Sequence, residues 1–362
     1  GLSTAVEAAR IRTLCMGCDS RIHIDRDGQV SVGPERITAL SQLAARHPRV
    51  ADAIGGLRNR PENTWKASDL EYWDLYNAPD EEAMATLTDT ERRLVDALRD
   101  GPRSLTELMH DVEVYHPSQL PGRDLFRRGF LEAAALTPTD LLHVTGHMDL
   151  WDDETARRAV RIICRVFNKN REHFVEGTLD RMVRRIAEEV IIFLGTQGLG
   201  PGKMPYAIDG KWGRWFFEEM VTGESRFLSV NIDSRFPLLG TGAPAEYFIK
   251  RAADILSAPF VLPNHFAVAN AVGAVSGSIM ESCEAIVFTR ESEGTRVHVL
   301  QLDEQSEAFK EREDAEEQAE KRARQRALDA LTNAGVDEAQ VALTQRQDGA
   351  LLRITARPVG SP

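Results

Sequence analysis

The sequence predicts an α/β protein with a helical insert and a small α+β unit at its C-terminal end. Three patterns support this prediction. Residues 237–256 read as a strand, a glycine turn and a helix, residues 88–136 as three short helices and a strand, and residues 284–362 as two hairpins around a long helix. We expect the first pattern to carry function, because backbone N–H groups at a helix N-terminus bind anions.

The first pattern begins with Pro237-Leu-Leu239, which we expect to be a short buried strand. The two glycines of Gly240–Ala243 then let the backbone come close to a ligand. Pro244 is typical of the first helical turn and predicts a helix that runs to about residue 256. A second helix, of small residues, is expected from Phe266 to Ser278. A purely structural turn is the alternative, because Gly-x-Gly alone is weak evidence for a ligand site.

Residues 37–150 are expected to form an insert that contains a compact helical unit, residues 88–136. Thr88 and Ser104 are each followed three residues later by a glutamate, which is the spacing of a capping box. A third helix is expected near residues 124–130. This spacing resembles a winged helix-turn-helix, which we interpret as a structural or partner-docking module. DNA binding is the alternative, and it predicts a basic face on this unit.

The remaining segments flank these patterns. Asp25-Arg-Asp-Gly28 lies between two alternating runs and predicts a β-hairpin within residues 1–36. Residues 151–283 are expected to hold helices and then the strand–turn–helix. Residues 284–362 are expected to form a separate ββαββ unit. Its helix should run from about Asp303 to Ala334, with alanines every four residues on one side.

Composition excludes several classes of function. The chain has 362 residues, of which 42% are hydrophobic and 28% charged, and its net charge is -12. Such a charge argues against a general nucleic-acid surface and against binding to an anionic membrane. No apolar run approaches the length of a membrane span. Four cysteines are too few for a disulfide framework, so we expect a cytoplasmic protein.

Two groups of residues have the spacing of metal ligands. Cys15 and Cys18 can chelate zinc or another transition metal, form a redox pair, or simply pack in a tight turn. A closed zinc site needs four ligands, so His23, His143 or His147 would complete it only if the fold brings them close. These histidines are also spaced as a metal pair on a helix, although Gly146 argues against a continuous helix there.

Several segments together resemble one protein family. The stretches PLLGTGAPAEYFIKRAADIL (237–256) and VLPNHFAVANAVGAVSG (261–277) resemble the adenosine-side motif of the actin, sugar-kinase and heat-shock-chaperone superfamily. They are more similar to the hydantoinase/oxoprolinase family. Four further segments agree with that family in order along the chain: Ile11–Ile22, Val32–Arg36, Leu136–Val144 and Leu150–Asp152. In this family glycines stand where Cys15 and Cys18 stand here.

The resemblance implies an actin-like (ribonuclease H-like) ATPase fold that uses ATP and Mg²⁺. It implies catalytic roles for Asp19 and Ser20, for which an ordinary turn at a strand end is the alternative. It also implies a set of adenosine-binding residues: Gly240, Thr241, Gly242, Ala243, Asn270 and Gly273. The implied reaction is ATP-dependent phosphorylation of an amide, imide or ketone carbonyl on a small-molecule substrate, as in hydantoinases, 5-oxoprolinases and related carboxylases.

The Asp-x-Gly-Gly-Thr turn that binds phosphate in this superfamily is absent from the sequence. We therefore expect the chain to be the C-terminal portion of a longer or split protein. An N-terminal half or complementary subunit would carry the phosphate loop, and a larger hydantoinase-B-like subunit is an expected partner. The alternative function is a non-hydrolytic ATPase that activates a partner such as a corrinoid protein, docked through the insert or through the aromatic residues near Trp212–Phe217.

Overall fold

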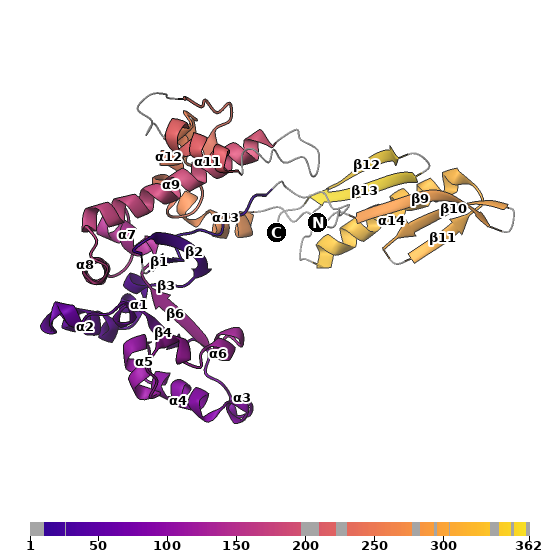
Figure 1. Cartoon of the computed structure of the whole chain (residues 1–362). Helices are drawn as coiled ribbons and strands as arrows, with labels where there is room; N and C mark the ends of the chain where they lie inside the picture. Colours follow the sequence, from indigo (N-terminus) through magenta and orange to yellow (C-terminus); the bar gives the residue numbers. More distant parts are fainter. Residues whose placement is uncertain are drawn as a thin grey trace. The chain divides into compact units, whose positions relative to one another are not determined.

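The computed structural model describes residues 11–25, 27–196, 210–221, 230–276, 283–292, 295–303, 305–333, 340–348 and 351–359. The fold is mixed α/β, as predicted, with several separate sheets (Figure 1). The chain divides into two compact units, Gly1–Pro263 and Asn264–Pro362. Among the helices that the structure describes, none is long and apolar enough to cross a membrane.

The predicted N-terminal hairpin is confirmed. Strand β1 (Ser20–Ile24) pairs antiparallel with β2 (Val30–Arg36), so that Ser20 lies opposite Arg36 at the open end. Asp25 closes the turn, because its carboxylate accepts hydrogen bonds from the backbone N–H groups of Asp27 and Gln29 at 2.9 and 2.7 Å. The hairpin therefore fixes the position of the residues that flank its open end.

A four-stranded sheet follows, with strand order β3–β6–β4–β5. Its strands are β3 (Thr38–Ala39), β4 (Tyr72–Leu75), β5 (Arg103–Ser104) and β6 (Leu131–Ala135). The helices in this part of the chain are α1 (Leu40–Arg46), α2 (Pro48–Gly56), α3 (Glu81–Thr86), α4 (Asp89–Leu98), α5 (Leu105–Asp111) and α6 (Arg123–Arg127). Four 3₁₀ turns lie between them: Leu57–Asn59, Glu62–Thr64, Ala67–Asp69 and Pro117–Gln119.

Helices α4, α5 and α6 and strand β6 lie where the sequence predicted them. Both capping boxes form, with Thr88 paired to Glu91 and Ser104 paired to Glu107. These elements share a separate hydrophobic core: Leu94, Val95, Leu98, Leu105, Leu108, Leu125 and Leu131. The pairing of β6 with β4 ties this core to the rest of the unit.

Three further helices join α1 and α2 in the main core of the first unit: α7 (Pro138–Val144), α8 (Asp153–Val166) and α9 (Arg171–Gly195). The helices expected within residues 151–283 are present, and Ile162 on α8 and Met182 on α9 are buried, at 1% and 2% exposure. Two short helical segments come next, α11 (Lys211–Phe216) and the π-helix η5 (Phe217–Val221). In the predicted aromatic segment Phe217 is buried and Trp215 is exposed, while the Trp212 side chain lies outside the described residues.

The strand–turn–helix forms a small β–α–β unit. Strand β7 (Leu238–Leu239) leads through the glycine turn into α12 (Ala245–Ile255), and β8 (Phe260–Val261) returns parallel to β7. Pro244 is the N-cap of the helix, which therefore begins at Ala245, one residue after the predicted start. The prediction of a buried strand is wrong, because Leu239 is 59% exposed and β8 is the one strand that pairs with β7 among the described residues.

The second unit begins with a 3₁₀ turn (Phe266–Val268) and α13 (Ala269–Ser276); the predicted continuation to Ser278 lies outside the described residues. A five-stranded antiparallel sheet follows, with strand order β11–β10–β9–β13–β12. Its elements are β9 (Cys283–Ser292), β10 (Thr295–Leu302), β11 (Gln305–Phe309), α14 (Arg312–Asn333), β12 (Gln340–Asp348) and β13 (Leu351–Val359) (Figure 1).

The helix of this unit is correctly predicted in kind but not in extent. Residues 305–309 form a third strand paired with β10, so α14 starts at Arg312 and not near Asp303. The alanine stripe faces the sheet, because Ala315, Ala319 and Ala323 are fully buried and share a core with the strands. Small side chains let the helix pack closely on the sheet.

Candidate functional site

The two glycines of the turn have different structural roles. A Cβ added to Gly240 would lie 3.1 Å from the Ala245 Cβ and 3.2 Å from Phe260 Cε2, so Gly240 allows close packing between helix and strand. Gly242 has φ of +95°, where a side chain is strained, and a Cβ there would meet, among the described atoms, only Pro244 Cδ at 3.9 Å. Open space thus lies next to Gly242 and not next to Gly240.

A cavity of about 670 Å³ begins at this turn and extends along α12. Ala243 and Pro244 line its start, and Tyr247, Lys250 and Arg251 line the helix side. The Arg251 guanidinium bonds to the Tyr247 hydroxyl and to the Asp180 carboxylate, and it lies 4.9 Å from the centre of the Tyr247 ring. Burial raises the pKa of Tyr247, so its hydroxyl stays neutral.

His147 also lines this cavity, together with Gly146 and Glu176. Its ring centre lies 4.5 Å from that of Tyr247. The chain after α7 therefore brings one predicted metal ligand beside the helix that follows the glycine turn. The cavity combines the two rings with two cationic side chains and three carboxylates, which are Glu176, Glu246 and Asp254. The rings can stack on a planar ligand.

Asn270 and Gly273 lie on α13 in the second unit, whereas Gly240, Thr241, Gly242 and Ala243 belong to the first. Both α13 residues are exposed, and a Cβ on Gly273 would meet no atom within 4 Å among those described. A shared adenosine site for the two groups of residues stays a prediction.

Ser20 is almost fully buried, at 2% exposure. Its hydroxyl accepts a hydrogen bond from the backbone N–H of Gly17 at 2.9 Å, while its own N–H donates to the Gly17 carbonyl at 3.1 Å. These bonds give Ser20 a structural role in the turn before β1. Asp19 points elsewhere: its carboxylate is half-exposed and lies 3.5 Å from the Nε atom of Arg36.

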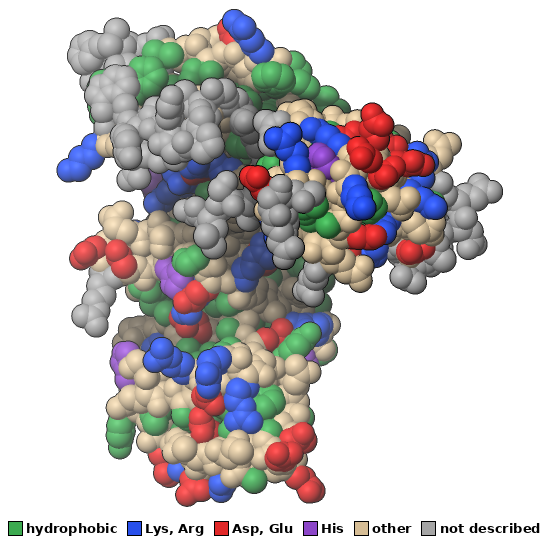
Figure 2. Space-filling view, turned by 90° about the vertical axis from the view of Figure 1, so that its right-hand side faces the viewer, with side chains coloured by type: hydrophobic (Ala, Val, Ile, Leu, Met, Phe, Trp, Pro, Cys, Tyr) green, Lys and Arg blue, Asp and Glu red, His purple; other side chains and the backbone are tan. Residues whose placement is uncertain are grey.

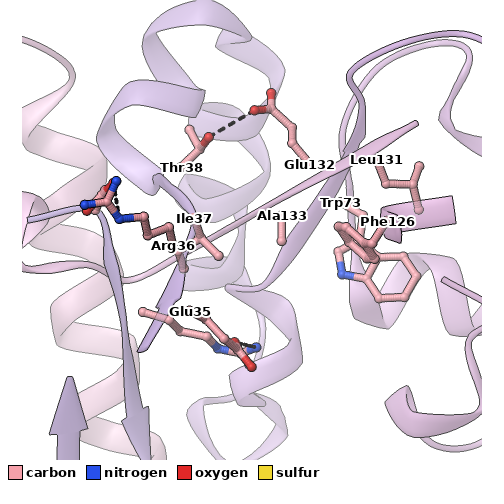
Figure 3. A pocket seen from close by; sticks show the side chains of 11 residues that line it. Glu35, Arg36, Ile37, Thr38, Trp73, Phe126, Leu131, Glu132 and Ala133 are labelled. Carbon is pink, nitrogen blue, oxygen red and sulfur yellow. Dashed lines mark hydrogen bonds and ion pairs between the residues drawn. The ribbon is translucent and has the colours of Figure 1, made fainter. Parts of the chain in front are cut away.

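Asp19 and Arg36 line a second cavity, of about 650 Å³, between the hairpin and the four-stranded sheet. Figure 3 shows Arg36 on one side of this cavity and the rings of Trp73 and Phe126 on the other. Thr38 and Glu132 also line this cavity, and the Thr38 hydroxyl donates a hydrogen bond to the Glu132 carboxylate at 3.1 Å. The cavity thus has a charged end and an aromatic end, and we call it the Arg36 pocket.

Cys15 and Cys18 differ in environment. Cys15 is exposed, whereas burial, with a smaller effect of Asp19, raises the pKa of Cys18 to about 12. A raised pKa disfavours the thiolate, which is the form that binds metals and attacks disulfides. Within the described part of the chain, no group of three or more His, Cys, Asp or Glu side chains is placed to hold a metal ion. Metal binding at Cys15 and Cys18 stays a prediction.

His143 is buried on α7, with its ring 6.0 Å from that of Trp151. Neither ring nitrogen has a hydrogen-bond partner among the described residues. Burial lowers the pKa of His143, although Asp140 and Asp153 oppose this. His143 is therefore neutral in the folded protein. It lies beside Trp151, whereas His147 lies beside Tyr247. Binding of one metal ion by these two histidines stays a prediction.

Both cavities are also lined by residues that the sequence did not identify as functional. Tyr247 and Lys250 lie within the predicted helix, but no local pattern distinguishes them from other surface positions. Trp73 and Phe126 come from segments about fifty residues apart in the insert, and their rings meet edge to face at 5.0 Å. Only the position of Arg36, at the end of a segment with a family resemblance, was a signal in the sequence.

Comparisons with protein families, curated proteins and solved structures found no match for this chain.

Proposed function

We propose that this chain supplies the adenosine-side wall of an ATP site in an enzyme that activates a carbonyl group by phosphorylation. The observation that carries the proposal is the β7–turn–α12–β8 unit. In it a glycine turn joins the carboxyl end of a parallel strand to a helix N-terminus. Ligands of α/β proteins bind at this end of parallel strands, where helix N–H groups point outward.

The residues around the turn leave a space of the size that a nucleotide needs. Thr241 and Ala243 are exposed, and the space next to Gly242 is open. The adjoining cavity lies within the range of about 300–1,000 Å³ that is usual for ligand pockets. Lys250 and Arg251 add positive charge along it. Mg²⁺ would arrive with ATP and be held mainly by the phosphates.

The proposed substrate is an amide, imide or ketone, as in hydantoinases, 5-oxoprolinases and related carboxylases. Phosphorylation of the carbonyl or enol oxygen converts a poor leaving group into a good one. Asp19 is the proposed carboxylate that orients the reacting group. The phosphate loop is assigned to an N-terminal half or complementary subunit, because the sequence has no Asp-x-Gly-Gly-Thr motif.

The nucleotide site is tested by calorimetric titration of the chain with ATP, AMP and adenosine. We expect AMP and ATP to bind with similar affinity, because the proposed site holds the adenosine end. Gly242→Val should abolish this binding, since its side chain enters the open space beside the turn. The variant also strains the backbone, at a cost of about 1–3 kcal/mol.

Gly129→Val is the matched control for that strain. Gly129 has φ of +73°, and a Cβ there meets no described atom within 4 Å. It lies just before β6, outside the cavity next to α12. The control should lose a similar amount of stability and keep its nucleotide affinity. Equal nucleotide affinity in the wild type and in Gly242→Val would reject the adenosine site.

The alternative function is an ATPase that activates a partner protein, for example a corrinoid protein. It is favoured by exposed aromatic side chains on the insert, where Tyr115 is 97% and Tyr76 is 67% exposed. Phosphate release separates the two functions once the complementary subunit is supplied. The enzyme releases phosphate when hydantoin or 5-oxoproline is added, whereas the activator responds to its partner protein and not to these amides.

The geometry does not favour DNA binding by the insert. Residues 88–135 contain nine Asp or Glu residues against seven arginines. Six of the seven arginines lie within 4 Å of a carboxylate: Arg92, Arg93, Arg99, Arg103, Arg127 and Arg128. Figure 2 shows the blue and red side chains interspersed over the lower part of the molecule, which holds these helices. A continuous basic face, which DNA binding needs, is not formed by these arginines.

A further inference from the structure

One end of the Arg36 pocket is apolar and is lined by two aromatic rings. Trp73 and Phe126 meet there at an interplanar angle of 88°. Gly122 makes room for this pair, because a Cβ at Gly122 would lie 2.5 Å from the Trp73 ring. Leu131 and Ala133 continue the apolar surface along β6. This end can bury a flat or bulky apolar group against aromatic rings.

Most charged side chains at the other end of the pocket already form ion pairs with each other or with neighbouring residues. Arg21 is paired with Glu71 at 2.5 Å and with Glu35 at 3.2 Å. Glu132 is paired with Arg46 at 3.1 Å and accepts the hydrogen bond from Thr38. These groups have little bonding capacity left for a ligand.

The Asp19–Arg36 pair is different. Its single contact, at 3.5 Å, is longer than a charge-assisted hydrogen bond. Arg36 is 80% exposed and Asp19 49% exposed, and neither side chain has another ion pair among the described residues. Arg36 therefore keeps free N–H donors, and Asp19 keeps free acceptor sites, side by side at the rim of one cavity.

We propose that the Arg36 pocket binds a free α-amino acid with an aromatic or other large apolar side chain. The ligand carboxylate pairs with Arg36, its ammonium pairs with Asp19, and its side chain lies against Trp73 and Phe126. One loose internal ion pair is replaced by two ion pairs to the ligand. The net charge of the pocket does not change, so no charge is left unpaired.

Ligands that carry only one of the two charges fit less well. A simple carboxylic acid would bond to Arg36 but would place its negative charge beside Asp19. A simple amine would bond to Asp19 but would repel Arg36. The arrangement of the two side chains therefore favours a zwitterion over either ion alone. This inference does not rest on the proposed nucleotide site, which is built by other residues; Asp19 is the one residue that it shares with the proposed reaction.

The test is calorimetric titration of the whole chain with phenylalanine, 3-phenylpropionate, phenethylamine and glycine. The second and third compounds each lack one charge, and glycine lacks the ring. We expect phenylalanine to bind about tenfold more tightly than each of the other three, as is typical for one lost charged hydrogen bond or one lost ring contact. An AMP titration of the same samples reports on the nucleotide site separately.

Two variants test which side chain binds the carboxylate of the ligand and which binds its ammonium group. Arg36→Gln should remove the preference for phenylalanine over phenethylamine, and Asp19→Asn should remove its preference over 3-phenylpropionate. Arg58→Gln and Asp52→Asn make the same chemical changes at exposed positions outside the pocket and should preserve both preferences. The proposal is overturned if folded wild-type protein does not bind phenylalanine, if all four compounds bind equally, or if the pocket variants behave as the controls do.

Discussion

The sheet of β7 and β8 and the sheet of β9 to β13 differ in how many strands they pair and in how far their side chains are buried. The first is a parallel pair of two-residue strands, and Leu239 on it is 59% exposed. The second is a five-stranded antiparallel sheet covered by α14, and Leu300 on it is 1% exposed. Antiparallel sheets need cover on one face only, whereas parallel sheets are normally buried on both. The second unit thus stabilises its own sheet, while the β7–β8 pair leaves surface accessible at the proposed nucleotide site.

The largest effect is expected from Leu300→Ala. Removing a fully buried leucine leaves a cavity, so we expect the free energy of unfolding to fall by about 3 kcal/mol. The change should destabilise the second unit and leave the first unit intact. Urea denaturation followed by circular dichroism, with hydrogen exchange to locate the loss, measures both. A decrease in the free energy of unfolding of less than about 1 kcal/mol would contradict the burial of Leu300 between the sheet and α14.

A smaller effect, confined to the first unit, is expected from pH. The buried His143 resists protonation, because burial lowers its pKa below the ordinary 6.5. Below pH 6.5 the unfolded chain therefore binds more protons than the folded chain at this residue, and the free energy of unfolding falls as the pH drops. His143→Phe should make this fall shallower. Urea denaturation at several pH values checks it, and parallel curves for the two proteins would exclude His143 as the cause.

The smallest effect is expected from Leu239→Ala, which makes the same chemical change as Leu300→Ala on the open pair. Because Leu239 is mostly exposed, the free energy of unfolding should change by less than about 0.5 kcal/mol. The two variants are compared in the same urea titration. A loss at Leu239 as large as that at Leu300 would show that the β7–β8 pair is covered in solution.

Elements defined by neighbouring residues were predictable. The capping boxes of α4 and α5 and the turn at Asp25 depend on contacts within a few residues, and the alanine stripe of α14 is visible as a four-residue spacing. The start of α14 was not predictable from charge and alanine spacing, because residues 305–309 pair with β10 instead. The exposure of Leu239 was also missed, because an apolar dipeptide does not reveal how many strands flank it.

The sequence by itself determined the local elements of this protein: the hairpin, the capped helices and the glycine turn before α12. Only the tertiary structure decided what the polar residues do. It buried Ser20 in a turn and joined the Asp140 carboxylate to the Ser41 N–H at 2.8 Å across about a hundred residues. It also placed Arg36 opposite the rings of Trp73 and Phe126, with Asp19 at 3.5 Å from Arg36. Helix caps and turns form between residues a few positions apart, whereas a pocket requires distant segments to pack together, and no local pattern records that packing.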